Sequence, residues 1–314
     1  MSKSVGLLVS VAATMLVASL FMLVSSVNPA RAVSPEPNKV TNNTTHDHTP
    51  SYSPSGEKIA YRGVSSLSGR LSNDIFTINV DGTGRFNVTA DTKNERDPSY
   101  SPDGEKIAYA GYDGQDWEIY TINADGGERI QITNNTTNEL ELSYSPDGEK
   151  IAYEGWDGQD FEIYTINADG GERIQITNNN ANETDPSYSP SGKKIAYAGH
   201  DGQDFEIYTK YVGGGERIQI TNNNINDTEL SYSPDGRKIA YKRKEIAYVN
   251  SRYVTRDREI YTITLGPARR VVKVTHNGRT DEEPSYSPDG EKIAYQGNDG
   301  HDKEIYTINA DGGG

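Results

Sequence analysis

Residues Pro98–Tyr109 read PSYSPDGEKIAY, and variants of this stretch begin again near His48, Glu141, Asp185, Glu229 and Glu283. In Ser101-Pro102-Asp103-Gly104, Pro and Asp at the second and third positions favour a type I turn, and Gly accepts the positive φ that closes a hairpin with a bulge. The flanking runs alternate and are rich in strand formers. The stretch therefore predicts a β-hairpin that the chain repeats six times.

One full unit, Asp97–Asn135, contains four short runs with strand character, separated by turn residues. The expected strands are 98–101, 106–110, 117–123 and 129–133. Four strands in a period of about 44 residues are typical of a propeller blade. No helical periodicity is found after residue 32. The sequence predicts an all-β, six-bladed β-propeller.

The two ends of the repeat array complement each other. Residues 39–43 read KVTNN and match the end of a repeat, as in IQITNN at 130–135, whereas the last copy stops after Gly312 without such a strand. We therefore expect the N-terminal strand to complete the last blade and close the ring, which removes the exposed edges of an open array.

The first 32 residues differ from the rest of the chain. Lys3 precedes an apolar run, Val5–Val24, and Ala30-Arg31-Ala32 follows it, a pattern typical of a cleaved secretory signal. The alternative is an uncleaved anchor, because about twenty apolar residues can span a bilayer. The expected organisation is a signal at 1–32, a linker at 33–38 and a propeller at 39–314. It predicts export to the periplasm or the extracellular side of the envelope, without a membrane span after cleavage.

Composition limits the classes of partner. The net charge of −15 argues against nucleic acid, because phosphate backbones require a basic surface. It fits cations, basic partners or polar saccharides. No cysteine is present, so lipoprotein anchoring and disulfides are excluded. We expect a monomer whose stability comes from packing and ring closure.

Two acidic positions recur before the Tyr of each Ser-Tyr-Ser motif. Five residues before it stand Asp47, Glu95, Glu139, Glu183, Asp227 and Asp281. Three residues before it stand Thr49, Asp97, Glu141, Asp185, Glu229 and Glu283. In an extended segment, positions two apart point the same way. We therefore expect two stacked carboxylate rings near the mouth of the channel.

Such rings could hold a hard cation such as Ca²⁺, or dock a basic peptide. The alternative interpretation is structural, with each acid accepting hydrogen bonds from backbone N–H groups of a neighbouring blade. No dense Asp-x-Asp-x-Asp-Gly loop is present, which weakens a dedicated calcium site. No cofactor is expected, and Ca²⁺ remains the only candidate.

The loops expected on the same face combine acids with aromatic rings. Tyr112, Trp156 and His200 stand at equivalent positions and could stack on sugars, or pack against the adjoining loop. Beside them the loops carry Asp113, Asp116, Asp157, Asp160, Asp201, Asp204, Asp299 and Asp302. This face is the second candidate for binding.

Two blades depart from the repeat. Longer central loops are expected at Gly63–Asn73 in the first blade and Lys242–Asp257 in the fifth, and the fifth blade is rich in Lys and Arg. The basic residues fit a partner site, an inter-subunit contact, a set of internal salt bridges, or a decayed repeat with a solvated loop.

The motifs Tyr144–Gly148, Lys150–Tyr153, Glu162–Tyr164 and Asn167–Gly170 resemble the WD40-like repeat of TolB-type β-propellers. The resemblance covers about Lys39–Gly314 and implies a periplasmic or extracellular six-bladed propeller used as a binding platform. The short linker leaves no room for the N-terminal α/β domain of TolB, so the resemblance is limited to the propeller.

The function that follows is non-enzymatic binding of a protein or peptide through the acidic face, with a basic segment as the candidate partner. The alternatives are a Ca²⁺-dependent scaffold, or a carbohydrate-binding or polysaccharide-lyase-like propeller, since related propellers resemble oligogalacturonate lyases. A lyase of that kind needs clustered metal ligands in the channel. The five histidines are scattered among the repeats, and no nucleophile-elbow motif is present.

Overall fold

The computed structural model describes residues 36–67, 69–249 and 252–312, with the side chains of 246–256 left aside. The predicted signal, residues 1–32, lies outside the described residues. Within the described ranges, no helix is long and apolar enough to cross a membrane.

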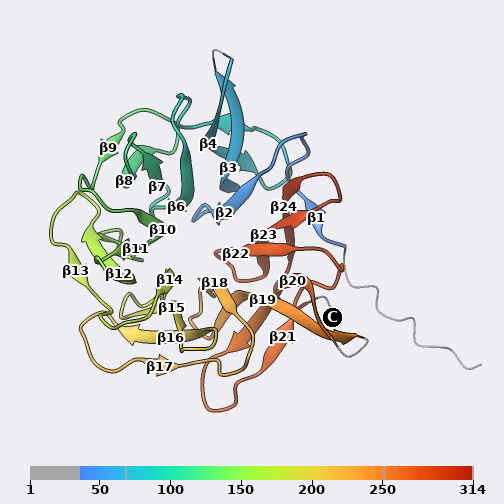
Figure 1. Ribbon diagram of the computed structural model, residues 1–314. Coiled ribbons are helices and arrows are strands. Elements are labelled where there is room, and N and C mark those ends of the chain that lie inside the picture. The colour runs from blue at the N-terminus through green and yellow to red at the C-terminus, as the bar shows by residue number, and fades with distance from the viewer. Residues whose placement is uncertain (1–35, 68, 250–251, 313–314) are drawn as a thin grey trace, which may run out of the picture. The chain divides into compact units, whose positions relative to one another are not determined.

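Six four-stranded antiparallel sheets are arranged as blades around a central axis (Figure 1). Blade 1 contains β2 (His48–Tyr52), β3 (Lys58–Leu67), β4 (Arg70–Asn79) and β5 (Phe86–Asn87). Blade 2 contains β6 (Glu95–Tyr100), β7 (Lys106–Tyr112), β8 (Trp117–Asn123) and β9 (Ile130–Gln131). Blade 3 contains β10 (Glu139–Tyr144), β11 (Lys150–Trp156), β12 (Phe161–Asn167) and β13 (Ile174–Gln175). Blade 4 contains β14 (Glu183–Tyr188), β15 (Lys194–His200), β16 (Phe205–Tyr211) and β17 (Ile218–Gln219).

Blade 5 contains β18 (Asp227–Tyr232), β19 (Lys238–Val249), β20 (Arg252–Thr264) and β21 (Val271–Lys273). Blade 6 contains β22 (Asp281–Tyr286), β23 (Lys292–Asn298), β24 (Lys303–Asn309) and β1 (Asn38–Lys39). The all-β, six-bladed propeller predicted from the repeats is confirmed.

The repeated hairpin has the predicted turn chemistry. The Ser101 N–H donates to the Lys106 carbonyl at 2.9 Å, and the Gly104 N–H donates to the Ser101 carbonyl at 2.9 Å. Gly104 has a φ of 77°, which glycine adopts without a Cβ clash. The Asp103 carboxylate accepts from the Ser101 hydroxyl at 2.6 Å and the Glu105 N–H at 3.0 Å, so it fixes the turn from inside.

The N-terminal strand closes the ring, as predicted. In β1, Asn38 pairs with Thr307 and Lys39 with Tyr306 of β24. The Val40 N–H then donates to the Ile305 carbonyl at 2.8 Å, and Val40 is only 3% exposed. The last blade is therefore assembled from both ends of the repeat array.

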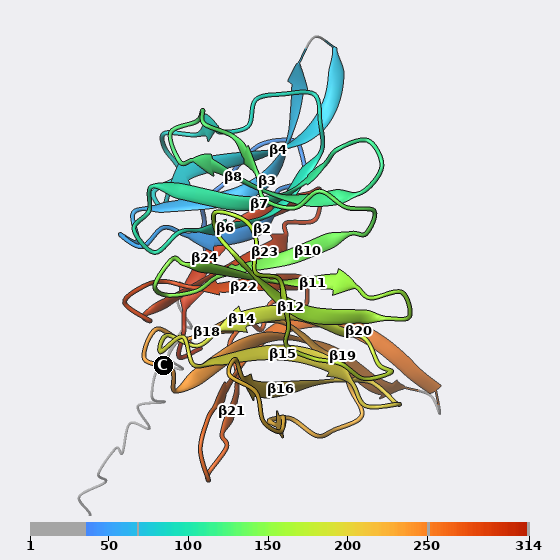
Figure 2. The same ribbon diagram turned by 90° about the vertical axis from the view of Figure 1, so that its left-hand side faces the viewer.

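The long loops predicted in blades 1 and 5 are mostly strand. β3 and β4 pair as far as Leu67 opposite Arg70, and β19 and β20 pair as far as Val249 opposite Arg252. The first of these hairpins projects beyond its neighbours (Figures 1 and 2). The prediction of loops was wrong because the two strands of each hairpin stay paired past the usual turn position. In blade 5 this extension is rich in β-branched and aromatic residues, whereas in blade 1 it consists mainly of Ser and Leu.

Repeated Tyr residues on the second strands form the core. Each is at most 1% exposed. They are Tyr61, Tyr109, Tyr153, Tyr197, Tyr241 and Tyr295. Each stacks on an aromatic ring of the third strand, with centroids 5.7 Å apart in the Tyr153–Tyr164 pair. The apolar clusters join residues of adjacent blades, for example Ala60 and Ile75 with Ile107 and Tyr109. The core therefore lies between the blades.

Candidate functional site

The centre of the propeller is built by an irregularity that recurs in every first strand. In β6 the pairing with β7 shifts register between Arg96 and Ser99, and Asp97 between them has a φ of 54°. The same left-handed conformation occurs at Thr49, Glu141, Asp185, Glu229 and Glu283. Holding a non-glycine residue in this conformation costs roughly 1–3 kcal/mol, so contacts with the surrounding blades must stabilise it. The bulge turns each of these side chains out of the sheet and toward the axis.

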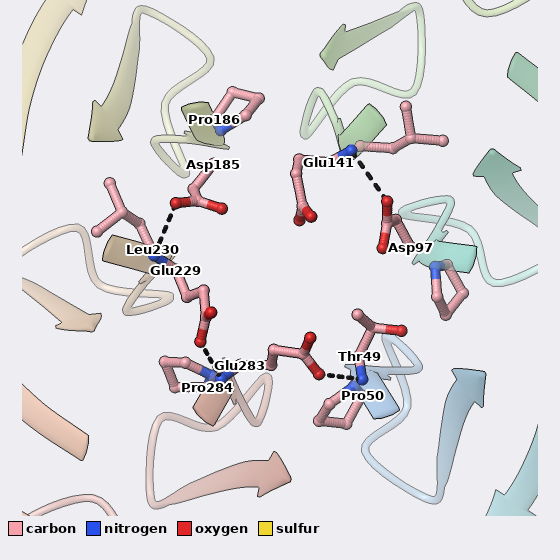
Figure 3. A pocket seen from close by; sticks show the side chains of 12 residues that line it. Thr49, Pro50, Asp97, Glu141, Asp185, Pro186, Glu229, Leu230, Glu283 and Pro284 are labelled. Carbon is pink, nitrogen blue, oxygen red and sulfur yellow. Dashed lines mark hydrogen bonds between the residues drawn. The ribbon is translucent and has the colours of Figure 1, made fainter. Parts of the chain in front are cut away.

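These six residues, here called the central ring, line a cavity of about 110 Å³ on the axis. The residue that follows each of them, Pro or Leu, completes the wall. Figure 3 shows the side chains of Glu141, Asp185, Glu229 and Glu283 pointing into this space. Five carboxylates and one Thr hydroxyl therefore surround a volume that suits one small cationic group.

Hydrogen bonds link the central ring from blade to blade. The Glu141 N–H donates to Asp97 Oδ2 at 3.2 Å, and the Glu229 N–H donates to Asp185 Oδ2 at 2.9 Å. The Glu283 N–H donates to Glu229 Oε2 at 2.7 Å, and the Thr49 N–H donates to Glu283 Oε2 (Figure 3). One oxygen of each of these acids thus accepts a hydrogen bond from a backbone N–H of the neighbouring blade, which is the structural role considered in the sequence analysis. The second oxygen remains for other partners.

The cations of the protein neutralise only part of this charge. Arg96 pairs with Asp97 at 2.7 Å and with Glu141 at 3.1 Å, and Lys242 pairs with Glu229. Among the described residues, no ion pair reaches Asp185 or Glu283. Five carboxylates therefore share two directly bound cations.

The remaining charge perturbs the acids. Burial raises the pKa of Glu283 to about 8, and the neighbouring Glu229 adds to the effect. Burial also raises the pKa of Glu141, Asp185 and Glu229, again with repulsion from other ring carboxylates. A cation entering the ring would replace the lost hydration and favour the charged forms.

Two buried oxygens of the central ring have no hydrogen-bond partner. They are Asp97 Oδ1 and Thr49 Oγ1, in side chains of residues only 4% and 8% exposed. A buried acceptor without a donor costs about 1–3 kcal/mol. Both residues line the axial cavity, so a donor placed there would remove this cost.

The other predicted ring lies elsewhere. Its six acids are all 0% exposed and do not line the axial cavity. They are Asp47, Glu95, Glu139, Glu183, Asp227 and Asp281. Asn side chains at the end of the preceding blade bind most of them, as Asn135 binds Glu139 at 3.0 Å. The structure thus differs from two stacked rings, because the bulge at the central ring breaks the alternation on which that prediction relied.

A charged layer beside the central ring was missed by sequence reasoning. The Glu282 carboxylate accepts a hydrogen bond from Gln296 Nε2 at 2.7 Å, and it forms salt bridges with Arg258 at 2.7 Å and Lys303 at 3.0 Å. Glu154 lies on the same strand position as Gln296 and is 8% exposed. One sequence feature could have indicated this layer: the residues at the positions of Glu282 and Gln296 differ from repeat to repeat, whereas the residues beside them recur.

Histidine does not form a metal cluster in the described part of the chain. The His46 and His48 rings lie 6.1 Å apart, and His48 Nδ1 contacts Gln296 Oε1 at 2.5 Å. Burial and the nearby Arg62 lower the pKa of His48 to about 3, so it is neutral. Every described group of three or more possible ligands consists of Asp and Glu.

The predicted rim aromatics are half-exposed. Tyr112 and Trp156 each keep 37% exposure. Trp156 packs edge-on against Phe161 and His200 against Phe205, both with centroids 5.2 Å apart. Trp156, His200 and Arg217 also line a groove of about 1130 Å³ between blades 3 and 4. The rings thus pack on a neighbouring ring, and Tyr112 and Trp156 also keep part of their surface exposed to solvent.

Four of the described basic residues of blade 5, Lys242, Arg243, Arg258 and Lys273, form salt bridges within the propeller. Arg243 binds Asp227 through Nε and Nη2, both at 2.7 Å, and Lys273 pairs with Glu245 at 2.6 Å. Arg252 and Arg256 lie outside the described side chains. Arg243 and Lys273 therefore compensate acids of their own blade, and Arg258 pairs with Glu282 of blade 6.

Comparison with known proteins agrees with this architecture. A TolB from Acinetobacter baumannii is 20% identical, with a TM-score of 0.63 over 85% of this chain and 62% of that one. A protein of Agrobacterium tumefaciens assigned as TolB is 20% identical, with a TM-score of 0.65 over 85% of this chain and 91% of that one. An oligogalacturonate lyase from Vibrio parahaemolyticus is 13% identical, with a TM-score of 0.59 over 86% and 92%. These likenesses concern the fold alone.

A comparison with curated proteins found no match. Residues 35–245 match the family model described as the TolB beta propeller domain, which is more than half of the chain. Blade 6 and most of blade 5 lie beyond the matched range and continue the same repeat. The chain therefore belongs to the TolB beta propeller domain family.

Proposed function

We propose that this chain is an exported, non-enzymatic binding propeller that docks a basic segment of a partner protein in the central ring. One observation carries the proposal: five carboxylates surround a cavity of about 110 Å³ and have only two directly bound cations. A Lys or Arg side chain from a partner would supply the missing charge and hydrogen-bond donors. Export rests on the sequence pattern of residues 1–32, with cleavage after Ala32.

The peptide test uses a short lysine-rich peptide and the double variant Asp185→Asn/Glu283→Gln. These two acids have no ion pair among the described residues, and their amide replacements keep an acceptor for the backbone N–H of the next blade. Because the variant can no longer present these two carboxylates to a bound ammonium group, we expect at least tenfold weaker binding, about 1.4 kcal/mol. Fluorescence polarisation at pH 7.5 measures the dissociation constant.

The matched control removes two carboxylates from the opposite face. Asp103→Asn/Asp147→Asn removes the same number of carboxyl groups, and Asn retains the acceptor of the Ser-Pro-Asp-Gly turn. Its affinity should stay within about twofold of the original, because long-range attraction is screened by salt. An equal loss in both double variants would mean nonspecific attraction and would contradict docking in the ring.

The binding of this peptide should strengthen as pH rises from 6 to 8. The raised pKa of Glu283, about 8, keeps this carboxyl largely protonated near neutrality, so a bound ammonium must expel a proton. Calorimetry in two buffers of different ionisation enthalpy should therefore report proton release. Binding without proton release, and with the same affinity at pH 6 and pH 8, would contradict contact with the ring.

A second candidate function is carbohydrate binding in the groove between blades 3 and 4. It is favoured by the exposed face of Trp156 beside His200 and Arg217, since aromatic faces stack on sugar rings. Quenching of Trp fluorescence by acidic oligosaccharides, lost in Trp156→Ala, would support it. An unchanged spectrum at millimolar sugar would remove it.

A further inference from the structure

Four blades carry the same triad of acids outside the central ring. In blade 2 it consists of Asp113 and Asp116 in the loop after β7, and Glu118 in β8. One carboxylate oxygen of each lies within 4.8 Å of the others. Equivalent triads are Asp157, Asp160 and Glu162 in blade 3, Asp201, Asp204 and Glu206 in blade 4, and Asp299, Asp302 and Glu304 in blade 6.

In blade 6 a lysine side chain forms salt bridges with the acids of the triad. Lys39 Nζ lies 3.0 Å from Asp299 Oδ2 and 3.1 Å from Glu304 Oε1. The other oxygen of Glu304 accepts from the Thr41 hydroxyl at 2.5 Å, and Oε1 also accepts from the Asn43 N–H at 2.9 Å. An ammonium group from the outermost strand thus neutralises this triad.

The position of Lys39 can be followed through the other blades by strand register. Lys39 pairs with Tyr306, and the residues paired with the equivalent aromatic are Gln131 in blade 2, Gln175 in blade 3 and Gln219 in blade 4. Glutamine brings no charge. The three blades that keep the triad thus lack the cation that blade 6 supplies.

Blades 1 and 5 are informative because they lack the two-Asp loop but keep the acid of the third strand. In blade 1 this acid, Asp74, accepts from Asn87 Nδ2 at 2.6 Å. In blade 5 the acid, Glu259, pairs with Lys273 Nζ at 3.2 Å. Asn87 and Lys273 occupy the register position of Lys39. In blades 1, 5 and 6, which have no glutamine at the register position of Lys39, the residue at that position therefore donates to the acid of the third strand.

In blades 2, 3 and 4 the triads keep buried oxygens without partners. The second Asp of each loop is only 7%, 8% and 7% exposed, at Asp116, Asp160 and Asp204. Oδ1 of each has no hydrogen-bond partner, and neither have Glu118 Oε2 and Glu162 Oε2. Glu118 and Glu162 are fully buried. Burying such carboxylates side by side without a counter-charge is strongly unfavourable.

We propose that blades 2, 3 and 4 each bind one divalent cation, Ca²⁺, at their Asp–Asp–Glu triads, in the place that Lys39 Nζ occupies in blade 6. Carboxylate oxygens are the ligands that Ca²⁺ prefers, and its flexible geometry accepts water on the exposed side of the loop. Each cation would tie the loop to the third strand of its blade.

The test counts calcium sites by calorimetry at pH 7.5, using the chain without its first 32 residues, stripped with EDTA. Lys39→Gln gives blade 6 the glutamine of blades 2 to 4, so the number of Ca²⁺ bound should rise by one. Gln131→Lys gives blade 2 the lysine of blade 6, so the number should fall by one. The triple variant Gln131→Lys/Gln175→Lys/Gln219→Lys should lose three.

The control is Asp302→Asn, which alters the triad that already has a lysine and should leave the count unchanged. Any Ca²⁺ bound in the central ring contributes equally to all these variants and cancels in the differences. Circular dichroism verifies folding, and Ca²⁺ should raise the melting temperature of the triple lysine variant less than that of the original chain. Ca²⁺ should raise the melting temperature of the original chain.

The proposal is overturned if the counts of Lys39→Gln and Gln131→Lys equal that of the original chain. It is also overturned if Ca²⁺ neither releases heat nor changes the melting temperature, because the triads would then be neutralised by protons. Neither result bears on peptide docking, which Asp185→Asn/Glu283→Gln tests separately.

Discussion

Val40→Asp should lower the melting temperature by about 10 °C, because it places an unpaired carboxylate in the seam that closes the ring. Val40 is 3% exposed and packs with Ile59 and Tyr61 of blade 1 and Ile305 of blade 6. Its N–H also continues the pairing of β1 with β24. We expect a loss of about 4 kcal/mol, because an unpaired buried charge belongs to the most destabilising class of substitutions. Differential scanning calorimetry measures the transition.

Opening this seam has a second expected effect. Without β1, the backbone of β24 becomes an unpaired strand edge, which favours association of chains. Light scattering should therefore detect oligomers of Val40→Asp under conditions where the original chain is monomeric.

The matched control is Ile130→Asp, at the corresponding outermost strand of blade 2. Ile130 is 45% exposed, so the new charge stays hydrated and the melting temperature should change by less than about 2 °C. If Val40→Asp behaved like Ile130→Asp, the N-terminal strand would not hold the ring together.

The metal-free chain should lose stability as pH rises from 5.5 to 8.5. Burial raises the pKa of Glu95, Glu154 and Glu283 to about 8, whereas an unfolded Glu titrates near 4.5. Between these values the folded state binds more protons than the unfolded state, so the free energy of unfolding falls with pH. The stabilisation is complete below about pH 4.5 and is lost as pH passes through about 8.

The exposed turn acids act in another pH range. Hydrogen bonds from Ser101 and the Glu105 N–H lower the pKa of Asp103, so its contribution is lost only as pH falls below the usual range of Asp. We therefore expect maximal stability near pH 5. Neighbouring carboxylates share protons, so the combined loss by pH 8.5 should be about 4 kcal/mol, or about 10 °C.

Thermal unfolding in EDTA at constant ionic strength measures this profile. Glu154→Gln should raise the melting temperature at pH 8.5 and leave it nearly unchanged at pH 5.5, because a neutral amide replaces a buried charge. Asp103→Asn serves as the control and should not flatten the profile. A melting temperature that climbs steadily from pH 5.5 to pH 8.5 would rule out this account of the buried acids.

Most of the fold could be predicted from the sequence because its determinants are local and repeated. Ser101–Gly104 encodes its own turn, and the match between residues 39–43 and 131–135 reveals closure without any knowledge of contacts. The extended hairpins of blades 1 and 5 could not be predicted in the same way. Where they end depends on the pairing of β3 with β4 and of β19 with β20.

The site was harder to predict because it depends on one irregular residue per blade. Glu95 and Asp97 are two positions apart and should share a face in a regular strand. The left-handed conformation of Asp97 sends one carboxylate to the axis and leaves the other between blades. The relation of Lys39 to Gln131 likewise becomes meaningful only when strand register places both beside the same triad.

A crystal structure of the chain with a bound lysine-rich peptide tests the central claim most directly. The account predicts one peptide ammonium nitrogen in the axial cavity, within hydrogen-bond distance of Asp185, Glu283 and the unpartnered Asp97 Oδ1. A peptide bound elsewhere, for instance in the groove beside Trp156 with the axial cavity holding only water, would contradict it.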